Sequence, residues 1–146
     1  MSIGALLGDV SEEKRRALTS YGLNLGICFQ MVDDLLDFTA DEKVLGKPVN
    51  NDLREGKLTL PVIFLLRKAG AVGEKTVSHV LADRGFERVT REELLRLARE
   101  HGALDEARAL AERYAEAARK DLAAFDRSPF REALAVLPDF ILSRDH

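Results

Sequence analysis

The sequence has a single cysteine, Cys28, and no run of eighteen apolar residues. One cysteine cannot form an intrachain disulfide, and its position among apolar residues predicts a buried thiol in a reducing compartment. Because no long apolar run is present, we expect no membrane-spanning segment. The amino terminus also lacks the basic and apolar regions of a signal peptide, so we expect a cytoplasmic protein.

The chain has no excess of positive charge either. It has 22 Lys and Arg residues and 25 Asp and Glu residues, and this balance argues against a nucleic-acid-binding protein. The sequence also lacks the GxxxxGKS/T phosphate loop, the HExxH zinc motif and any convincing Ser/His/Asp arrangement, and its three histidines are far apart. Catalysis by those routes therefore has no support.

Hydrophobic residues make up 46% of the chain and recur at steps of three and four residues. This spacing is typical of amphipathic helices, so we predict an all-α fold, with residues 1–146 forming a single domain. Local signals also predict where individual helices begin and end. Helix starts are predicted at Thr59, at the capping box that begins at Thr90 and at Ser128, with a helix end at Gly70 and a break or kink at Pro138.

The segment FQMVDDLLD, residues 29–37, places three carboxylates in otherwise apolar surroundings. In a helix, at about 100° per residue, Asp33, Asp34, Asp37 and Gln30 share a sector roughly 100° wide. Two such charges about 6 Å apart repel by roughly 3 kcal/mol at an effective dielectric constant near 20. A divalent cation removes this repulsion, and carboxylate oxygens suit Mg²⁺. The alternative interpretation is a solvated acidic patch on a hydrophobic helix.

A polar segment, KVLGKPVNNDLREGK at residues 43–57, follows the acidic one. Its glycines and proline break regular structure, so turns carry Lys47 and Lys57 and allow them to fold back over the carboxylates. Lysines beside a carboxylate-bound metal suggest a polyphosphate ligand. Ordinary surface lysines remain the alternative for each of the two.

The two segments FQMVDDLLD and GKPVNNDLREGKLTLP together resemble the second aspartate-rich motif and trailing loop of trans-type polyprenyl diphosphate synthases. The similarity extends from about Gly4 to the last residues. The final run SPFREALAVLPDFILSRD is also somewhat similar to long-chain synthases such as octaprenyl diphosphate synthase. The resemblance implies the C-terminal half of the helical isoprenoid synthase bundle.

The resemblance also implies a role for each matching acidic residue. Asp33, Asp34 and Asp37 would bind Mg²⁺ ions that bridge to a diphosphate. Asp52 would support these ligands from behind, without binding metal itself.

The resemblance further implies how the substrates are held. Lys47 and Lys57 would contact the diphosphate, and Gln30 would line the reacting end of the site. The family's reaction joins an allylic diphosphate to isopentenyl diphosphate, so these two molecules are the expected partners. Such a site needs no protein nucleophile, because it stabilises the leaving group and keeps water from the allylic cation.

The sequence departs from the family in having one aspartate-rich motif where such synthases have two. We therefore expect the C-terminal part of a synthase, with weak or no activity alone, that forms a homo-oligomer or pairs with the missing N-terminal half. Two alternatives remain: a non-catalytic partner or regulatory subunit of a synthase, and a helical scaffold that kept the motif but not the reaction. Terpene cyclases also use aspartate-rich metal sites, but the GKLTLP element after the motif favours a chain-elongating synthase.

Overall fold

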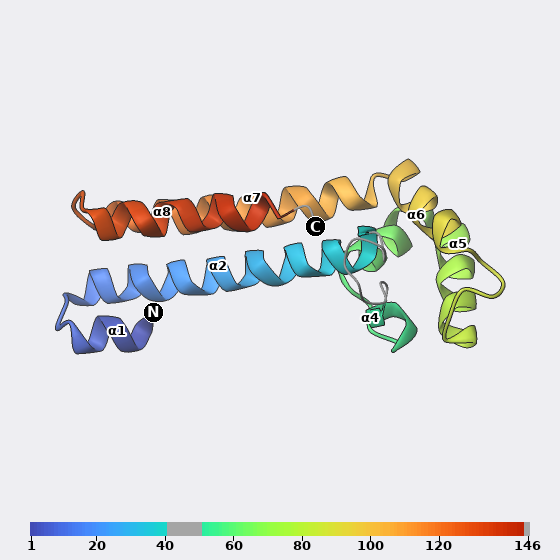
Figure 1. The fold of residues 1–146 in the computed structure, drawn as a ribbon, viewed down its shortest axis with the longest axis horizontal. Coiled ribbons are helices and arrows are strands. Elements are labelled where there is room, and N and C mark those ends of the chain that lie inside the picture. The colour runs from blue at the N-terminus through green and yellow to red at the C-terminus, as the bar shows by residue number, and fades with distance from the viewer. Residues whose placement is uncertain (41–50, 145–146) are drawn as a thin grey trace. The chain divides into compact units, whose positions relative to one another are not determined.

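The computed structural model describes residues 1–40 and 51–144, and for Asn51 it describes the backbone alone. Within these ranges the regular secondary structure is entirely helical (Figure 1), which confirms the predicted all-α fold. The helices are α1 (Ser2–Leu7), α2 (Glu12–Thr39), α4 (Asn51–Arg54), α5 (Leu60–Asp83), α6 (Arg91–Glu100), α7 (Ala103–Asp121), the 3₁₀ turn η1 (Leu122–Ala124) and α8 (Pro129–Leu142). None of the described helices combines the length and hydropathy needed to cross a membrane.

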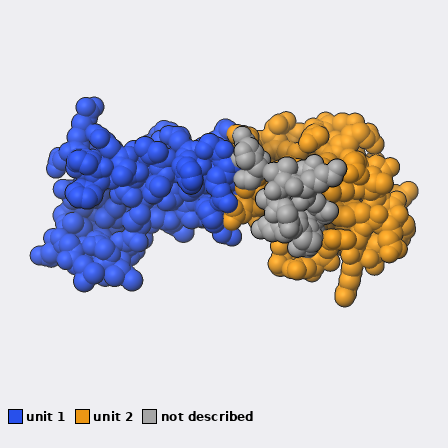
Figure 2. Space-filling model, viewed as in Figure 1, with its two compact units in different colours: residues 1–32, 110–144 blue, residues 33–109, 145–146 orange. Residues whose placement is uncertain are grey.

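The chain divides into two compact units, which are coloured separately in Figure 2. Unit 1 contains residues 1–32 and 110–144, and unit 2 contains residues 33–109. Helices α2 and α7 each contribute residues to both units. The expectation of a single domain over the whole chain stays a prediction.

Three helix starts match the sequence signals: α5 begins directly after Thr59, α6 after Thr90 and α8 after Ser128. The hydroxyl of Thr90 accepts the backbone N–H of Glu93 at 3.2 Å, and the Glu93 carboxylate accepts the backbone N–H of Thr90 at 2.8 Å. This reciprocal pair is the predicted capping box of α6, and it satisfies two backbone donors at the helix start. At α8, Ser128 accepts the backbone N–H of Arg131 at 3.2 Å, and Pro129 occupies the first turn.

Gly70 lies within α5, where a helix end was predicted. Its dihedral angles, φ 51° and ψ −133°, are not helical, so the helical geometry is interrupted there as expected. A new helical stretch begins directly afterwards and continues to Asp83. A positive φ of this kind is easily adopted by glycine, which has no Cβ to clash with the backbone.

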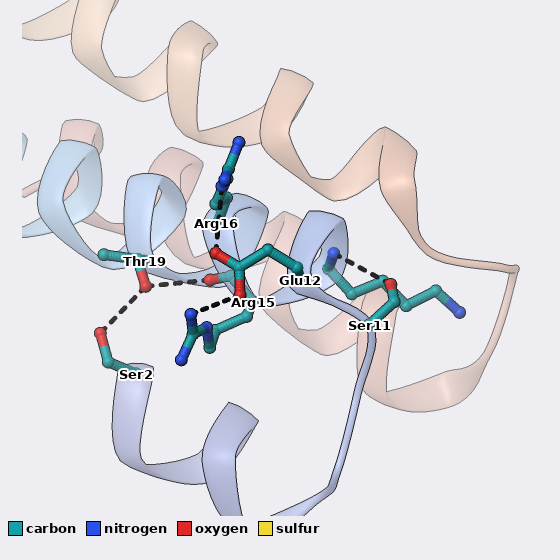
Figure 3. A network of polar contacts seen from close by, with 7 residues as sticks. Ser2, Ser11, Glu12, Arg15, Arg16 and Thr19 are labelled. Atoms are coloured by element: carbon teal, nitrogen blue, oxygen red, sulfur yellow. Dashed lines mark hydrogen bonds and ion pairs between the residues drawn. The ribbon is translucent and has the colours of Figure 1, made fainter.

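Polar contacts in unit 1 fix the start of α2 and join it to α1 (Figure 3). The hydroxyls of Ser2 and Thr19 form a hydrogen bond of 3.0 Å between the two helices. Ser11, directly before α2, accepts a first-turn backbone N–H at 3.4 Å. Glu12 accepts a hydrogen bond from Arg16 at 3.1 Å, which lowers the pKa of the Glu12 carboxyl. An ionised acid in this first turn favours the helix because the helix N-terminus carries partial positive charge.

The core of unit 1 forms where α2 meets the chain's last helices. Tyr21, Ala118 and Leu122 are buried there, with the partly buried Leu25 packed against them. Cys28 is completely buried, and this burial raises the pKa of its thiol. The predicted buried cysteine is therefore confirmed.

In unit 2, α5 packs against both α4 and α6. Apolar side chains from these three helices are buried, among them Leu53 of α4, Val62 and Leu65 of α5 and Leu94 of α6. Phe38, near the end of α2, is also buried in this unit. The packing fixes the helix ends that surround the acidic motif.

A break or a kink was predicted at Pro138. This proline lies inside α8, which continues past it to Leu142, so the break is wrong and the kink stays a prediction. Proline has no backbone N–H, and the carbonyl four residues earlier, that of Leu134, therefore lacks its usual helical donor. The hydroxyl of Tyr21 donates a hydrogen bond of 2.7 Å to this carbonyl. A side chain of α2 thus supplies the donor that the proline removes from α8.

This arrangement predicts that the loss of stability caused by Tyr21→Phe depends on the presence of Pro138. The substitution leaves a partly buried carbonyl without its donor, so we expect the free energy of unfolding to fall by about 1–3 kcal/mol. In a Pro138→Ala background the same substitution should cost much less, because alanine at this position restores the backbone N–H. Urea unfolding followed by circular dichroism measures both values.

Tyr114→Phe is the matched control, because Tyr114 is the only other tyrosine and lies in the same unit. It should change the stability by no more than a few tenths of a kcal/mol. An equal penalty for Tyr21→Phe with and without Pro138 would contradict this account of α8.

Candidate functional site

The three aspartates of the motif lie on the C-terminal part of α2, in unit 2. Asp33, Asp34 and Asp37 are all partly buried. Burial raises the pKa of the Asp34 carboxyl, and the negative charges of Asp52, Asp33 and Asp37 raise it further. The structure therefore brings the predicted supporting residue, Asp52 of α4, close enough to act electrostatically on the motif.

The Asp34 carboxylate also accepts a hydrogen bond from the backbone N–H of Leu60, which partly counteracts the rise in its pKa. Leu60 is the first residue of α5, and Thr59 before it makes no side-chain cap. The first backbone donors of a helix need partners from outside it, and an anion there is favoured by the helix dipole. Asp34 therefore holds the start of α5 as well as forming part of the acidic stripe.

Lys57 follows α4 and contacts two acids of the same segment. Its ammonium lies 3.0 Å from Asp52 Oδ1 and 2.8 Å from Glu55 Oε2, and these carboxylates raise the pKa of the lysine. The Lys57 side chain is 61% exposed. Through Asp52, a solvent-accessible cation is therefore held beside the carboxylates of α2.

Arg91, the first residue of α6, contacts the end of α2. Its Nη2 atom donates to the carbonyl of Ala40 at 2.5 Å and to that of Phe38 at 3.5 Å. The last turn of α2 has no basic residue of its own, so a cation from another helix stabilises its terminal carbonyls. No local sequence pattern indicates this role, because Arg91 is 53 and 51 positions away from the residues whose carbonyls it contacts.

Gln30 is exposed and lies on α2 one helical turn before Asp33 and Asp34, so its place on the same helix face is as expected and its role stays a prediction. Lys47 lies outside the described residues. Within residues 1–40 and 51–144, no three His, Cys, Asp or Glu side chains are arranged to hold a metal ion. The aspartates are hard oxygen donors of the chemical type that Mg²⁺ prefers, but as they are arranged here they would not enclose an ion by themselves, and water or phosphate oxygens would have to supply most of its ligands.

The contact between Asp34 and Leu60 predicts a difference between two substitutions at one position. Asp34→Asn keeps an oxygen acceptor for the N–H of Leu60 and removes the repulsion from the neighbouring carboxylates. Asp34→Ala removes both the repulsion and the acceptor. We expect the Asn variant to be more stable than the Ala variant by about 1 kcal/mol, as for loss of a helix cap.

The measurement is chemical unfolding of both variants, with Glu13→Gln and Glu13→Ala as controls. Glu13 is an exposed acid at the other end of α2. Its two variants should differ by only a few tenths of a kcal/mol, as helix propensities do. Equal stabilities of Asp34→Asn and Asp34→Ala would show that the carboxylate does not cap α5.

The sequence matches known proteins over nearly its whole length. The family model described as polyprenyl synthetase matches residues 1–97. The chain is 37% identical over 143 residues to the short chain isoprenyl diphosphate synthase of Methanothermobacter thermautotrophicus, a match that covers 98% of this chain and 43% of that protein. It is 33% identical over 142 residues to the octaprenyl diphosphate synthase of Haemophilus influenzae, with 97% and 43% covered.

The fold is similar to solved structures of the same kind. The polyprenyl synthase from Caulobacter crescentus, crystallised in complex with calcium and isoprenyl diphosphate, matches with a TM-score of 0.83 and 37% identity, covering 99% of this chain and 44% of that one. The chain thus spans less than half the length of the relatives it matches and corresponds to their C-terminal part. This agreement confirms the expected part of the helical isoprenoid synthase bundle, and the chain belongs to the polyprenyl synthetase family.

Proposed function

We propose that this chain provides the diphosphate-binding part of a prenyltransferase that joins an allylic diphosphate to isopentenyl diphosphate. The observation that carries the proposal is the group of carboxylates at the end of α2, with the Lys57–Asp52 ion pair beside it. Family membership supports the type of reaction. The Caulobacter synthase, crystallised with a divalent cation and an isoprenyl diphosphate, supports the types of ligand.

In this proposal the acidic motif holds Mg²⁺. Asp33, Asp34 and Asp37 offer oxygen atoms from successive turns of one helix face, and Asp52 adds negative charge behind them. Bound Mg²⁺ would supply the positive charge that stabilises a departing diphosphate. The Asp34 carboxylate also accepts the N–H of Leu60, so in this proposal it would both cap α5 and contribute to the metal site.

The lysines bind the diphosphate directly. Lys57 presents an exposed ammonium, and Asp52 and Glu55 orient it from the same segment. Lys47 would add a second cation, and Gln30 would line the reacting end of the substrate. These groups bind and orient the substrate, and none of them is required to act as a nucleophile.

Pyrophosphate, the leaving group of the proposed reaction, is the direct probe of this function. Isothermal titration into the purified chain should give binding that depends on Mg²⁺. Asp33→Ala combined with Asp37→Ala should reduce the affinity at least tenfold, because it removes two of the three motif carboxylates. Lys57→Ala should weaken binding less, because one exposed cation is lost while the metal ligands remain.

The matched control is Glu112→Ala combined with Glu116→Ala. These two exposed carboxylates are also four residues apart on one helix, α7, but they lie in unit 1. The control should bind pyrophosphate as the wild-type chain does. Absence of Mg²⁺-dependent binding by the folded wild-type chain would overturn the proposal for the isolated chain and favour a helical scaffold.

A second prediction concerns catalysis. The sequence carries one aspartate-rich motif, so the purified chain with Mg²⁺, an allylic diphosphate and radiolabelled isopentenyl diphosphate should form little or no product. Adding a separately expressed N-terminal half of a related synthase should raise product formation. That increase should be lost with the Asp33→Ala, Asp37→Ala variant. Robust prenyl transfer by the chain alone would refute the requirement for a second motif.

A further inference from the structure

The side chain of Arg91 is inserted between the start of α6 and the end of α2, both within unit 2. Its Nη2 atom donates to the carbonyls of Phe38 and Ala40, two buried residues. Among the residues that the structure describes, its buried Nε atom has no hydrogen-bond partner. An unsatisfied buried donor is unfavourable, so this side chain is not placed for its own stability. Its contacts with the end of α2 are what its position achieves.

The start of α6 holds Arg91 in a defined place. Arg91 is the first residue of the helix and directly follows Thr90, which forms the capping box with Glu93. The helix behind it buries Leu94 and Leu95, and it packs against α5. A side chain carried by a packed helix is positioned more precisely than one carried by a loop. The guanidinium therefore reaches α2 from a fixed support.

The carbonyls that Arg91 contacts lie next to one aspartate of the acidic motif. Asp37 belongs to the last turn of α2, which ends two residues after it. The last carbonyls of a helix have no intrahelical donor, so the last turn opens more easily than the turns before it. Asp33 and Asp34 lie one turn earlier, and Asp34 also contacts the start of α5. Of the three aspartates, Asp37 is thus the one whose position depends most on how the end of α2 is held.

We propose that Arg91 is a positioning residue of the diphosphate site, which binds the backbone at the end of α2 and thereby fixes the turn that carries Asp37. The inference rests on the proposed function, because it concerns the geometry of the same site. Arg91 acts through the backbone of α2 and is not itself a ligand of the metal or the diphosphate. Its cation also suits this place, since the C-terminus of a helix carries partial negative charge.

A double-mutant cycle, measured by isothermal titration of pyrophosphate with Mg²⁺, tests this role. Arg91→Met removes the cation and its donors but keeps an unbranched apolar side chain, and it should weaken binding about fivefold, as expected for loss of a charge at a helix end. Combined with Asp37→Ala it should add little further loss, because the carboxylate that it positions is already absent. Combined with Asp33→Ala it should keep its full effect. Arg91→Lys retains a cation and should bind better than Arg91→Met.

Arg96→Met is the matched control for the titration. Arg96 is exposed on the same helix and pairs with Glu100 of that helix, so its variant should bind pyrophosphate as the wild type does. Circular dichroism verifies that each variant is folded. An Arg91→Met chain that binds like the wild type, or that loses as much affinity without Asp37 as with it, would overturn the positioning role. Absence of Mg²⁺-dependent binding by the wild-type chain would instead overturn the proposed function on which this role rests.

Amide hydrogen exchange tests the same role without any ligand. Arg91→Met should make residues 36–40 exchange about fivefold faster, because the last turn of α2 loses a partner that holds it closed. Residues 12–20, at the other end of α2 and in unit 1, should exchange as in the wild type. Unchanged exchange at residues 36–40 would overturn the positioning role, whether or not the chain binds pyrophosphate.

Discussion

The crowding of negative charge at the C-terminal end of α2 is the constraint on which the candidate site depends. Asp33, Asp34 and Asp37 lie near the helix end that already carries partial negative charge, and Asp52 adds a fourth carboxylate. The raised pKa of Asp34 reflects burial first and this crowding second. Carboxylates so placed make the folded state less favourable unless positive charge is brought to them. The contacts around the end of α2 supply that positive charge.

Contacts from several parts of unit 2 contribute it. The N-terminal amide of α5 donates to Asp34, Lys57 after α4 pairs with Asp52, and Arg91 of α6 covers the terminal carbonyls of α2. The amide of Leu60 is a single donor, Lys57 divides its charge between Asp52 and Glu55, and Arg91 contacts carbonyl groups. A divalent cation differs because one ion contacts several oxygens at once. In the proposed site, Mg²⁺ would therefore relieve more of this repulsion than any one of these contacts does.

Most features that could be predicted from the sequence, such as helix starts and shared helix faces, depend on local residue spacing. The capping box at Thr90 and the shared helix face of Asp33 and Asp37 follow from spacings of three and four residues, which a helix converts directly into neighbours. The contacts of Arg91 with Ala40, and of Asp34 with the N–H of Leu60, join residues far apart in sequence. They depend on how helices pack, and no local spacing encodes that. The sequence shows that Pro138 leaves the Leu134 carbonyl without its helical donor, but it does not show that Tyr21 supplies another.

The position of Lys57 shows how the folded chain could exchange one anion for another. Its two carboxylate partners, Asp52 and Glu55, are themselves partly exposed, and such surface ion pairs contribute at most about 1 kcal/mol each. A diphosphate carries more charge than either carboxylate and offers several acceptor oxygens to the same ammonium. Transfer of Lys57 from the acids to a diphosphate would therefore lose little stability, while Asp52 would remain beside the motif. An ion pair of this strength would hold the lysine near the proposed site and still leave it able to bind a diphosphate.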